Sequence, residues 1–459
     1  MLKRLRIQNF KAWRDTGDIR LAPLTVVFGA NSAGKSSLGH LLLALKQTAA
    51  SSDRKRALHL GDADSLIDLG TFTDCIHNHQ AGASLDVSID WALQKELQIT
   101  DPNTDQRFGG KVLSLHTELR EREGQPVVEQ LDYRLSDSDK AQLDICYSRK
   151  EKTKFELSSN SYRFVRTKGR VWSLPAPIKF YGFPDEAKAY FQNSGFLGEL
   201  MLETESMLDH LYYLGPLRGH PKRSYTWAGD VPPDVGQVGE RTIAAILAAS
   251  ARKLSRGYRR PAKPFEIFIA EWLRELRLIH EFKVHAIADG RKEYEVLIQT
   301  HRGASEVKIT DVGFGVSQVL PALVQAFYVP AGATVWMEQP EIHLHPQVQA
   351  SLADVFINAI HAREDGKERN VQLIIESHSE HFLNRLQRRI AEGELKPEEV
   401  AIYFCSRTDK ETELEPLQVN VFGEIDNWPE HFFGDEMADL TGRMVAAMKR
   451  QKDLEVPNA

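Results

Sequence analysis

Three short apolar runs, one near the amino terminus and two in the last third of the chain, predict buried strands. Residues 25–28 read Thr-Val-Val-Phe, residues 333–337 read Ala-Thr-Val-Trp-Met, and residues 371–375 read Val-Gln-Leu-Ile-Ile. The first run precedes a glycine-rich loop and then leucines at three- and four-residue spacing over residues 38–45, which indicates a helix. Strand, loop and helix in this order predict an α/β fold.

The stretch from residue 80 to residue 300 has a different pattern. Apolar residues recur at helical spacing over residues 186–211 and 241–278, in its second part. In its first part apolar and polar positions alternate, which predicts an antiparallel meander with strands at residues 85–91, 113–119, 131–135, 143–147 and 162–164.

The end of this stretch leads the chain back to the α/β domain. The pair Asp289-Gly290, between apolar segments 282–287 and 294–298, predicts a two-residue hairpin. We therefore expect an α/β domain split by an inserted β-meander and helical subdomain. The predicted parts are residues 1–80 and 301–410 for the two halves of the α/β domain, residues 81–300 for the insertion, and residues 411–459 for a short C-terminal extension.

Composition fits an ordinary globular protein. A chain of 459 residues with 42% hydrophobic and 27% charged residues predicts two to three domains and argues against disorder. It has no apolar run of about 18 residues and no signal peptide at its start, so we expect a soluble cytoplasmic protein without membrane contact. The three cysteines, Cys75, Cys146 and Cys405, stand far apart and predict reduced thiols.

The glycine-rich loop carries the strongest chemical signal. Residues 29–36 read Gly-Ala-Asn-Ser-Ala-Gly-Lys-Ser, the pattern of a phosphate-binding loop known as Walker A. In this pattern the loop amides and the lysine hold nucleotide phosphates, while the serine hydroxyl ligates Mg²⁺ at a helix N-terminus. We therefore predict a nucleotide and Mg²⁺ site with contacts from Asn31, Ser32, Gly34, Lys35, Ser36 and Ser37.

Polar residues at the ends of the two later apolar runs extend this prediction. Glu338 follows residues 333–337, where a P-loop NTPase places the Walker B acid that holds Mg²⁺. We predict Ser36 and Glu338 as the Mg²⁺ residues. His378 follows residues 371–375 and is a candidate contact to the γ-phosphate.

A further glycine-containing segment precedes the Walker B run. Gly313 and Gly315 are followed by Ser317-Gln318 and an apolar helical run. A helix N-terminus of this kind suits an anionic phosphate, because the backbone amides and the helix dipole favour negative charge.

The order of these segments resembles the ABC-type ATPase heads of the RecF, SMC and OLD (overcoming lysogenization defect) group. The resemblance rests on residues 2–11, the Walker A loop, the signature-like residues 313–318, residues 338–346 and the His378 switch. It implies that two protomers enclose two ATP molecules, in an ATP-dependent dimer or higher homo-oligomer. The signature residues that would face the ATP of the other protomer are Gly315, Ser317 and Gln318.

One residue departs from the family pattern. The Walker B acid is followed in the family by a catalytic glutamate, and Gln339 stands at that position. An amide is no general base at neutral pH, although it can still orient a water as glutamine does in small GTPases. We therefore predict Glu338, Gln339 and His378 as the catalytic residues and expect slow or absent ATP hydrolysis. Glu341, two residues later, is an alternative source of a base.

The C-terminal segment narrows the resemblance. Residues 423–436 look like the C-terminal extension of a bacterial ATPase subfamily of anti-phage operons, most like the ATPase subunit of Septu-type systems, which works with an HNH-nuclease partner. About fifty residues follow the head, too few for the Toprim nuclease domain of OLD proteins. Any nuclease is therefore expected on a separate effector.

Two basic clusters are candidates for DNA contact. One contains Arg252, Arg256, Arg259 and Arg260 with Tyr258, and the other spans residues 162–172 with Arg163, Arg166, Lys168, Arg170 and Trp172. Such clusters can neutralise phosphates or stack bases, but they are more often a solvated helix face or a contact to an acidic partner.

The sequence thus predicts an ATP-binding regulatory or scaffold subunit that dimerises on ATP and controls a partner nuclease in anti-phage defence. The main alternative is an actively hydrolysing ATPase that acts on DNA, as RecF-like and OLD-like proteins do. A weaker alternative is a toxin-neutralising subunit whose effector is an RNase.

Overall fold

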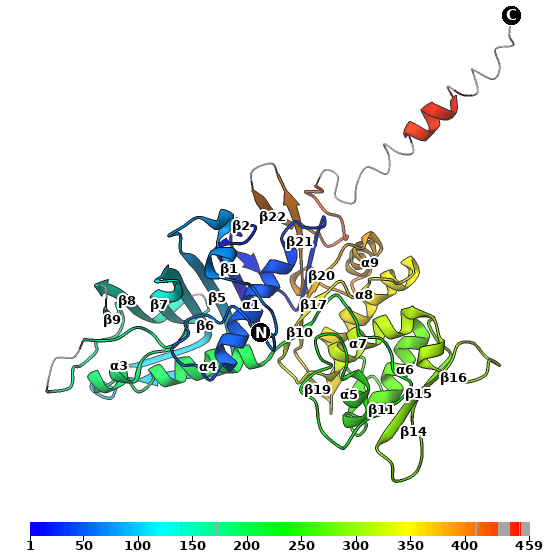
Figure 1. Ribbon diagram of the computed structural model, residues 1–459, viewed down its shortest axis with the longest axis horizontal. Helices are drawn as coiled ribbons and strands as arrows, with labels where there is room; N and C mark the ends of the chain where they lie inside the picture. The colour runs from blue at the N-terminus through cyan, green and yellow to red at the C-terminus, as the bar shows by residue number, and fades with distance from the viewer. Residues whose placement is uncertain are drawn as a thin grey trace, which may run out of the picture.

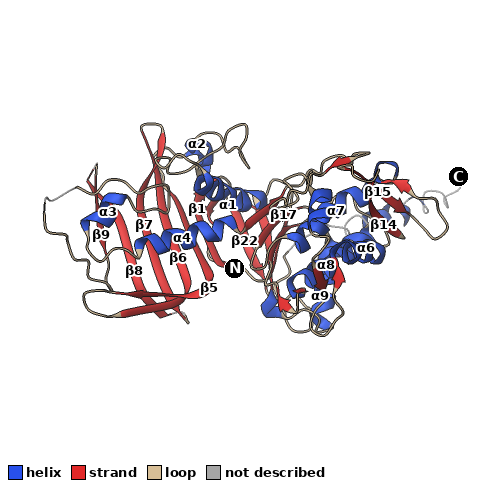
Figure 2. Ribbon diagram, turned by 90° about the horizontal axis from the view of Figure 1, so that it is seen from below, coloured by secondary structure: helices blue, strands red, loops and turns tan. Residues whose placement is uncertain are grey.

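The computed structural model contains two large β-sheets with a helical layer between them (Figure 1). It describes residues 1–138, 140–151, 153–169, 173–408, 411–429, 441–448 and 450. Figure 2 shows the larger sheet on one side of the molecule, helices α6 to α9 on the other, and strands β17 and β22 between them.

The six-stranded sheet carries the predicted chemistry. Its four adjacent pairs from β10 to β21 are parallel, and only its last pair is antiparallel. The strand order is β10 (Leu211–Leu214), β17 (Thr334–Glu338), β20 (Gln372–Glu376), β4 (Leu24–Gly29), β21 (Val400–Arg407) and β22 (Thr412–Leu417). Strand β4 of the Walker A loop therefore lies between two strands from the last fifth of the chain.

The second sheet is antiparallel and has eight strands. Its order is β2-β1-β5-β6-β7-β8-β9, with β3 paired to β1. Consecutive hairpins form most of it, as the alternating pattern predicts. The strands are β1 (Leu2–Phe10), β2 (Trp13–Asp15), β3 (Ile19–Arg20), β5 (Leu85–Thr100), β6 (Arg107–Arg122), β7 (Gln125–Asp137), β8 (Lys140–Glu151) and β9 (Lys154–Ser158).

Helices cover both faces of the six-stranded sheet. Helices α1 (Lys35–Ala50) and α4 (Leu197–Asp209) contribute to one core, shared with the antiparallel sheet. The second core, on the other face, contains α5 (Thr242–Ala248), α6 (Phe265–Glu275), α7 (Phe314–Tyr328), α8 (Pro346–His361) and α9 (Glu380–Ala391). Short helices are α2 (Phe72–Cys75), α3 (Asp185–Tyr190), η1 (His77–His79), η2 (Ile309–Asp311) and η3 (Pro397–Glu399).

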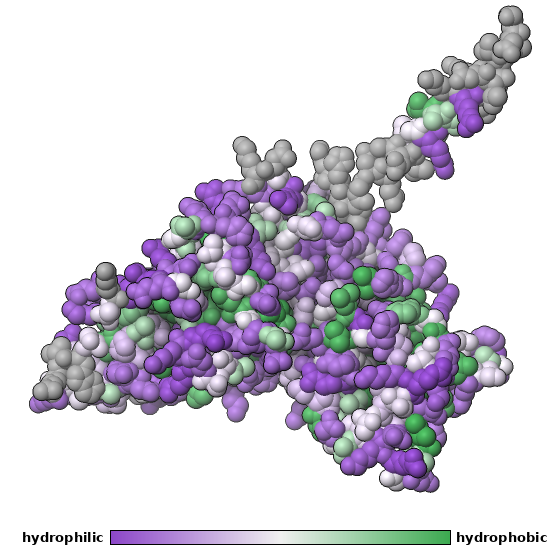
Figure 3. Space-filling view, viewed as in Figure 1, coloured by the Kyte–Doolittle hydropathy of each residue, from purple (hydrophilic) through white to green (hydrophobic). Residues whose placement is uncertain are grey.

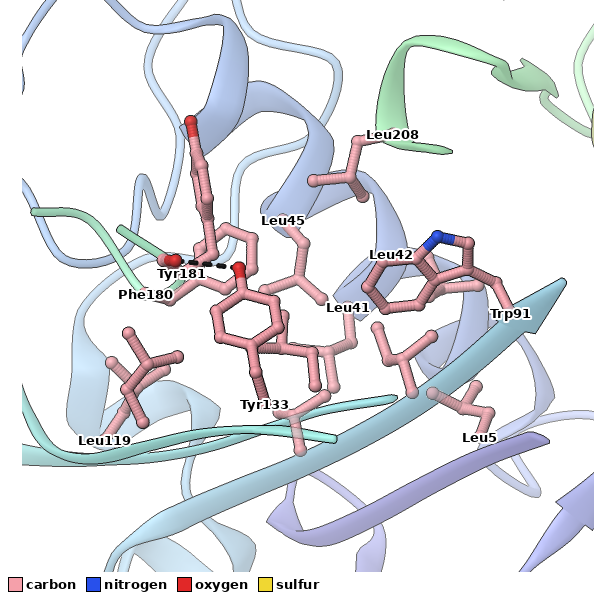
Figure 4. Close-up of a cluster of buried hydrophobic side chains, with 14 of the residues drawn as sticks. Leu5, Leu41, Leu42, Leu45, Trp91, Leu119, Tyr133, Phe180, Tyr181 and Leu208 are labelled. Carbon is pink, nitrogen blue, oxygen red and sulfur yellow. Dashed lines mark hydrogen bonds between the residues drawn. The ribbon is translucent and has the colours of Figure 1, made fainter. Parts of the chain in front are cut away.

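The first core joins the Walker helix α1 to the antiparallel sheet. Leu41, Leu42 and Leu45 of α1 lie against buried side chains of β1, β5 and β7, including Trp91 and Tyr133 (Figure 4). The Tyr133 hydroxyl donates a hydrogen bond of 2.8 Å to the Tyr181 carbonyl, so this buried polar group is satisfied. The meander thus supports the helix that carries the predicted phosphate-binding residues.

Two small sheets complete the fold beside the second core. One contains β11 (Tyr225–Thr226), β14 (Glu281–Ala286), β15 (Glu293–Gln299) and β16 (Val307–Lys308). The other contains β12 (Lys253–Ser255), β13 (Lys263–Pro264), β18 (Arg363–Glu364) and β19 (Lys367–Glu368). The turn between β14 and β15 contains Asp289-Gly290, where Gly290 has a φ of 75°. Residues 287–292 separate the two strands, so the hairpin loop is longer than the two residues predicted.

Several other elements differ from the predicted ones. The fifth meander strand is β9, whereas residues 162–164 form no strand; Tyr162 is instead buried and donates a hydrogen bond to the Asn193 carbonyl. The predicted helix at residues 186–211 divides into α3 and α4, and that at residues 241–278 into α5 and α6 with two short strands between them. Strand β10, within the predicted insertion, lies in the six-stranded sheet, and β22, within the predicted extension, pairs with β21.

The visible surface is largely hydrophilic, with smaller hydrophobic groups scattered over it (Figure 3). Within the part of the chain that the structure describes, no helix combines the length and the apolar character needed to cross a membrane.

Candidate nucleotide and magnesium site

The Walker A loop connects β4 to α1. Gly29 is the Cα partner of Cys405 on β21 and has a φ of 145°. A Cβ atom at Gly29 would lie 2.2 Å from the Cys405 carbonyl oxygen, so only glycine fits there. Gly34, with a φ of 94°, is the N-cap residue of α1. These two glycines let the chain turn from strand to helix while keeping the loop amides near the helix N-terminus.

Lys35 is buried at the start of α1. Its ammonium group donates to the carbonyls of Gly29 and Ala30, at 3.0 and 2.7 Å. Burial lowers its pKa, and Glu376 and Glu341 oppose that effect. Asn31 and Ser32 of the loop are exposed, whereas the Ser37 hydroxyl is buried and accepts a hydrogen bond from the Trp13 indole at 2.8 Å. The loop carbonyls thus hold the Lys35 ammonium group in place.

Two glutamates end the neighbouring strands β17 and β20. Glu338 and Glu376 are Cα partners in the parallel pairing, so their side chains lie on the same face. Trp336 and Ile374, two residues earlier on each strand, belong to the core that contains α1. Both carboxylates therefore lie on the face covered by α1.

Helix α1 places three residues against this face. The Ser36 hydroxyl donates to a Glu376 carboxylate oxygen at 3.0 Å, and one turn later His40 Nε2 lies 3.6 Å from a Glu338 carboxylate oxygen. Between them Gly39 packs on Trp336, where a Cβ atom would lie 2.4 Å from the indole ring. The missing side chain at Gly39 lets α1 approach the sheet closely.

Glu338 is held by further contacts. The Tyr213 hydroxyl, from β10, donates to a Glu338 carboxylate oxygen at 2.9 Å. Burial and the Glu338 charge raise the pKa of Tyr213, which keeps this hydroxyl protonated. Arg218, which the sequence gives no defined role, lies with its guanidinium 3.5 Å from the Glu338 carbonyl oxygen. Burial lowers the Arg218 pKa to about 10, so the guanidinium remains a cation at neutral pH.

The charge state of the site follows from burial. Burial and the neighbouring Glu338 charge raise the pKa of Glu376 to about 7. Burial and the Lys35 charge lower the pKa of His378 to about 4, so its imidazole is neutral at pH 7. A neutral imidazole can donate one hydrogen bond to a phosphate without adding charge.

Gln339 and Glu341 lie in the turn after β17. Gln339 has a φ of 45°. Its backbone N–H donates a hydrogen bond of 2.8 Å to the backbone carbonyl of Glu376, which fixes the start of the turn. Glu341 is buried and one of its oxygens accepts from the Ser377 hydroxyl and the His378 amide, both at 2.8 Å. Burial raises the pKa of Glu341. This carboxylate positions the His378 segment, and its role as a base stays a prediction.

The signature-like segment lies on the opposite side of the sheet, at the start of α7. Ser317 and Gln318 are buried, and the Ser317 hydroxyl donates to the Phe314 carbonyl at 2.8 Å. Gly315 is partly exposed and Phe314 exposes 54% of its surface. Among the described residues no hydrogen bond or ion pair joins this segment to residues 29–37 of the same chain. Contact with the ATP of a second protomer remains a prediction.

The predicted Mg²⁺ residues suit that ion chemically. Ser36 offers a hydroxyl and Glu338 a carboxylate, and Mg²⁺ prefers oxygen ligands. In the described ranges no group of three or more His, Cys, Asp or Glu residues is arranged to hold a metal ion. A Mg²⁺ ion at Ser36 therefore needs nucleotide phosphates for its remaining ligands, which is how this ion binds in ATPases.

The first basic cluster is partly neutralised by its own neighbours. Arg256 pairs with Glu275 at 2.7 Å and lies over the Trp272 ring at 4.0 Å, while Arg252 pairs with Glu364 at 2.6 Å. Arg170 and Trp172 of the second cluster lie outside the described residues, as do residues 430–436 of the C-terminal segment. Contact with DNA stays a prediction.

Comparison with known proteins supports the ATPase assignment. Residues 260–383, which include α7, β17 and β20, match a family model described as AAA ATPase domain. Residues 395–441 match a family described as protein of unknown function (DUF3696). The predicted fold class is confirmed as an α/β ATPase fold with an inserted antiparallel β-meander and helical subdomain. Among curated proteins, none gives a significant match.

Similar solved structures are heads of SMC proteins. An SMC head bound to the C-winged helix domain of ScpA has a TM-score of 0.43 at 11% identity, over 92% of this chain and 98% of the other. The SMC head domain from Thermotoga maritima has a TM-score of 0.39 at 13% identity, over 91% and 99%. An SMC head from Pyrococcus furiosus, bound to the C-terminal domain of ScpA, has a TM-score of 0.42 at 10% identity, over 91% and 96%.

Proposed function

We propose that this chain is an ATP-binding regulatory or scaffold subunit that dimerises on ATP, hydrolyses it slowly or not at all, and controls a partner nuclease in anti-phage defence. The observation that carries the proposal is that Lys35, Ser36 and Glu338 lie together in the candidate phosphate-binding site, while Gln339 stands where a catalytic glutamate is expected. A site that binds ATP without a general base keeps the γ-phosphate and can act as a latch.

The latch acts through a second protomer. Two heads that enclose ATP would be held together while it stays intact, and its loss would release them. ATP favours the closed pair only through its higher affinity for that state. The exposed start of α7 at Phe314 and Gly315 supports this arrangement, because the signature segment is open to a second chain.

The partner and the anti-phage setting rest on the resemblance of residues 423–436 to Septu-type ATPase subunits. The effector would be an HNH-type DNA nuclease encoded beside this chain. Affinity purification from the native host tests this part: an HNH nuclease that co-purifies supports it, whereas an RNase as the sole stable partner favours the toxin-neutralising alternative.

The rival function is an ATPase that turns over on DNA. Glu341 favours it, because this buried carboxylate has one oxygen without a hydrogen-bond partner in the described residues and acts electrostatically on Lys35. A carboxylate near the phosphates could supply the base that Gln339 lacks.

The decisive experiment compares nucleotide content and phosphate release. Wild-type protein should retain intact ATP and release phosphate slowly, whereas Gln339→Glu should release it about 100-fold faster, because a positioned general base contributes about that much. Glu338→Gln is the control, with no gain in rate. Brisk release by the wild type that is lost in Glu341→Gln would move the DNA-acting ATPase to first place.

A further inference from the structure

The Ser36 hydroxyl, which should ligate Mg²⁺, is already paired with an acid that the Walker motifs do not include. Glu376 accepts the Ser36 hydrogen bond with an oxygen–oxygen distance of 3.0 Å. Octahedral Mg²⁺ binds oxygens at 2.0–2.1 Å, so two adjacent ligands lie about 2.9 Å apart. Ser36 and Glu376 thus already have the spacing of neighbouring ligands on one ion.

Both carboxylates at this edge of the sheet are buried. Glu338 exposes 4% and Glu376 exposes 3% of their surfaces, and they face α1 from adjacent strands. Strands in a sheet lie about 4.8 Å apart, which brings two acids within reach of one small cation. Buried carboxylates are stable only when they are paired, protonated or bound to a metal.

The side chains around the two carboxylates pair only part of their oxygen atoms. Glu338 is held by Tyr213 and His40, but one carboxylate oxygen of Glu376 is buried without a hydrogen-bond partner in the described residues. The nearby cation, Lys35, directs its hydrogen bonds to the Gly29 and Ala30 carbonyls. Nucleotide phosphates would draw Lys35 further toward themselves, because they carry more negative charge.

We propose that Glu376 is a direct carboxylate ligand of the Mg²⁺ that accompanies the nucleotide, beside Ser36, with Glu338 as the second acid. This inference rests on the proposed ATP binding. It implies that metal-free nucleotide meets the negative charge of Glu338 and, when ionised, that of Glu376, and therefore binds weakly. The divalent cation then becomes a condition for nucleotide binding as well as for any chemistry.

The simpler reading is that Glu376 only anchors the N-terminus of α1 through its hydrogen bond with Ser36. Glu376→Gln separates the two roles, because the amide oxygen can still accept from Ser36 while the charge is lost. Glu338→Gln is the comparison within the site. Glu413→Gln, an exposed position on β22, is the matched control away from it.

The test measures Mn²⁺ affinity by electron paramagnetic resonance with a non-hydrolysable ATP analogue, and analogue affinity in EDTA by fluorescence. Glu376→Gln should lower the Mn²⁺ affinity at least tenfold. It should bind the metal-free analogue as tightly as the wild type or more tightly. Glu413→Gln should match wild type. Mn²⁺ affinity in Glu376→Gln within twofold of wild type would overturn the inference while leaving the proposed function intact.

Two further outcomes are informative. A wild-type protein that binds no analogue, with or without Mn²⁺, would remove the proposed function and this inference together. If Glu376→Gln does not fold, Glu376→Asp replaces it, because the carboxylate is kept but withdrawn by one methylene. Unchanged Mn²⁺ affinity in Glu376→Asp would contradict direct ligation.

Discussion

The two large sheets of this protein are built on opposite plans. Strands β17 and β20 of the six-stranded sheet are buried at every position and end in the acids of the candidate site. Strands β5 and β6 of the eight-stranded sheet alternate between buried and more exposed residues along much of their length. A parallel sheet covered on both faces collects side chains at one edge, whereas a one-sided antiparallel sheet mainly supplies a surface to pack on.

The difference suggests a division of labour. The meander carries none of the Walker or signature residues, yet it packs against α1 and so supports the predicted phosphate-binding loop. Substitutions in the six-stranded sheet and its loops should therefore change ligand binding. Substitutions in the meander should change the free energy of unfolding and leave nucleotide affinity near its normal value.

The largest expected effect comes from Lys35, and a second lysine of the same helix, Lys46, is its control. Lys35→Ala should weaken ATP binding about 100-fold or more, since charge-assisted hydrogen bonds to phosphate contribute about 1.5–3 kcal/mol each. Lys46→Ala is the matched control, because Lys46 also donates to two carbonyls, those of Leu208 and Asp209, at 2.9 and 3.1 Å. Isothermal titration should show normal ATP affinity for Lys46→Ala. Equal losses in both variants would contradict the division.

Two glycines test the contact between α1 and the sheet. Gly39→Ala should lower the free energy of unfolding by about 1–3 kcal/mol, because the added methyl meets Trp336 in a packed core. It should also weaken the Mg²⁺ dependence of nucleotide binding, since α1 carries Ser36. Gly198→Ala in α4 meets nothing within 4 Å and should stabilise by up to about 1 kcal/mol. Chemical denaturation measures both, and stabilisation by Gly39→Ala would refute the close packing.

The smallest expected effect tests the meander through pH. Hydrogen bonds to Asp132 and Asp86 raise the pKa of His116 to about 9, from an ordinary value near 6.5. Its stabilisation is therefore complete below about pH 6.5 and is lost as pH rises through 9. Because 35% of the side chain is exposed, solvent screening should reduce the effect to about 1 kcal/mol.

His116→Gln should abolish that pH dependence, measured by urea unfolding at pH 6 and pH 9.5. His285→Gln on β14 is the control, since no carboxylate lies within ion-pair distance of His285 in the described part of the chain. Nucleotide affinity should be unchanged in both variants. A change in ATP affinity in His116→Gln would show that the meander is energetically coupled to the candidate nucleotide site.

Much of the site could be predicted from sequence because its signals are local. The spacing of Gly29, Gly34, Lys35 and Ser36 identifies the loop, and a run of apolar residues ending in Glu338 identifies its acid. The contribution of Glu376 could not be predicted in this way. It depends on β20 lying between β17 and β4, and strand order is not written in any local pattern.

The missed strand and side-chain partners have the same cause. Strand β10 is four residues long and contains Tyr212 and Tyr213, so it has no long apolar run to reveal it. Tyr213 contacts Glu338 from a position 125 residues before it in sequence. His40 contacts Glu338 from α1. The turn at Asp289-Gly290 and the alternating meander were predictable because each depends on residues close together in sequence, although the loop at that turn is longer than the two residues predicted.

The order of strands around β4 also bears on how the chain is synthesised. The meander from β5 to β9 consists of consecutive hairpins, so we expect it to fold as soon as it leaves the ribosome. Strand β4 emerges earlier, yet both of its neighbours, β20 and β21, lie beyond residue 370. Its apolar residues must stay unpaired through most of translation. We therefore expect chaperone dependence and sensitivity to premature termination, because the predicted phosphate-binding loop lies near the start of the chain and its sheet partners near the end.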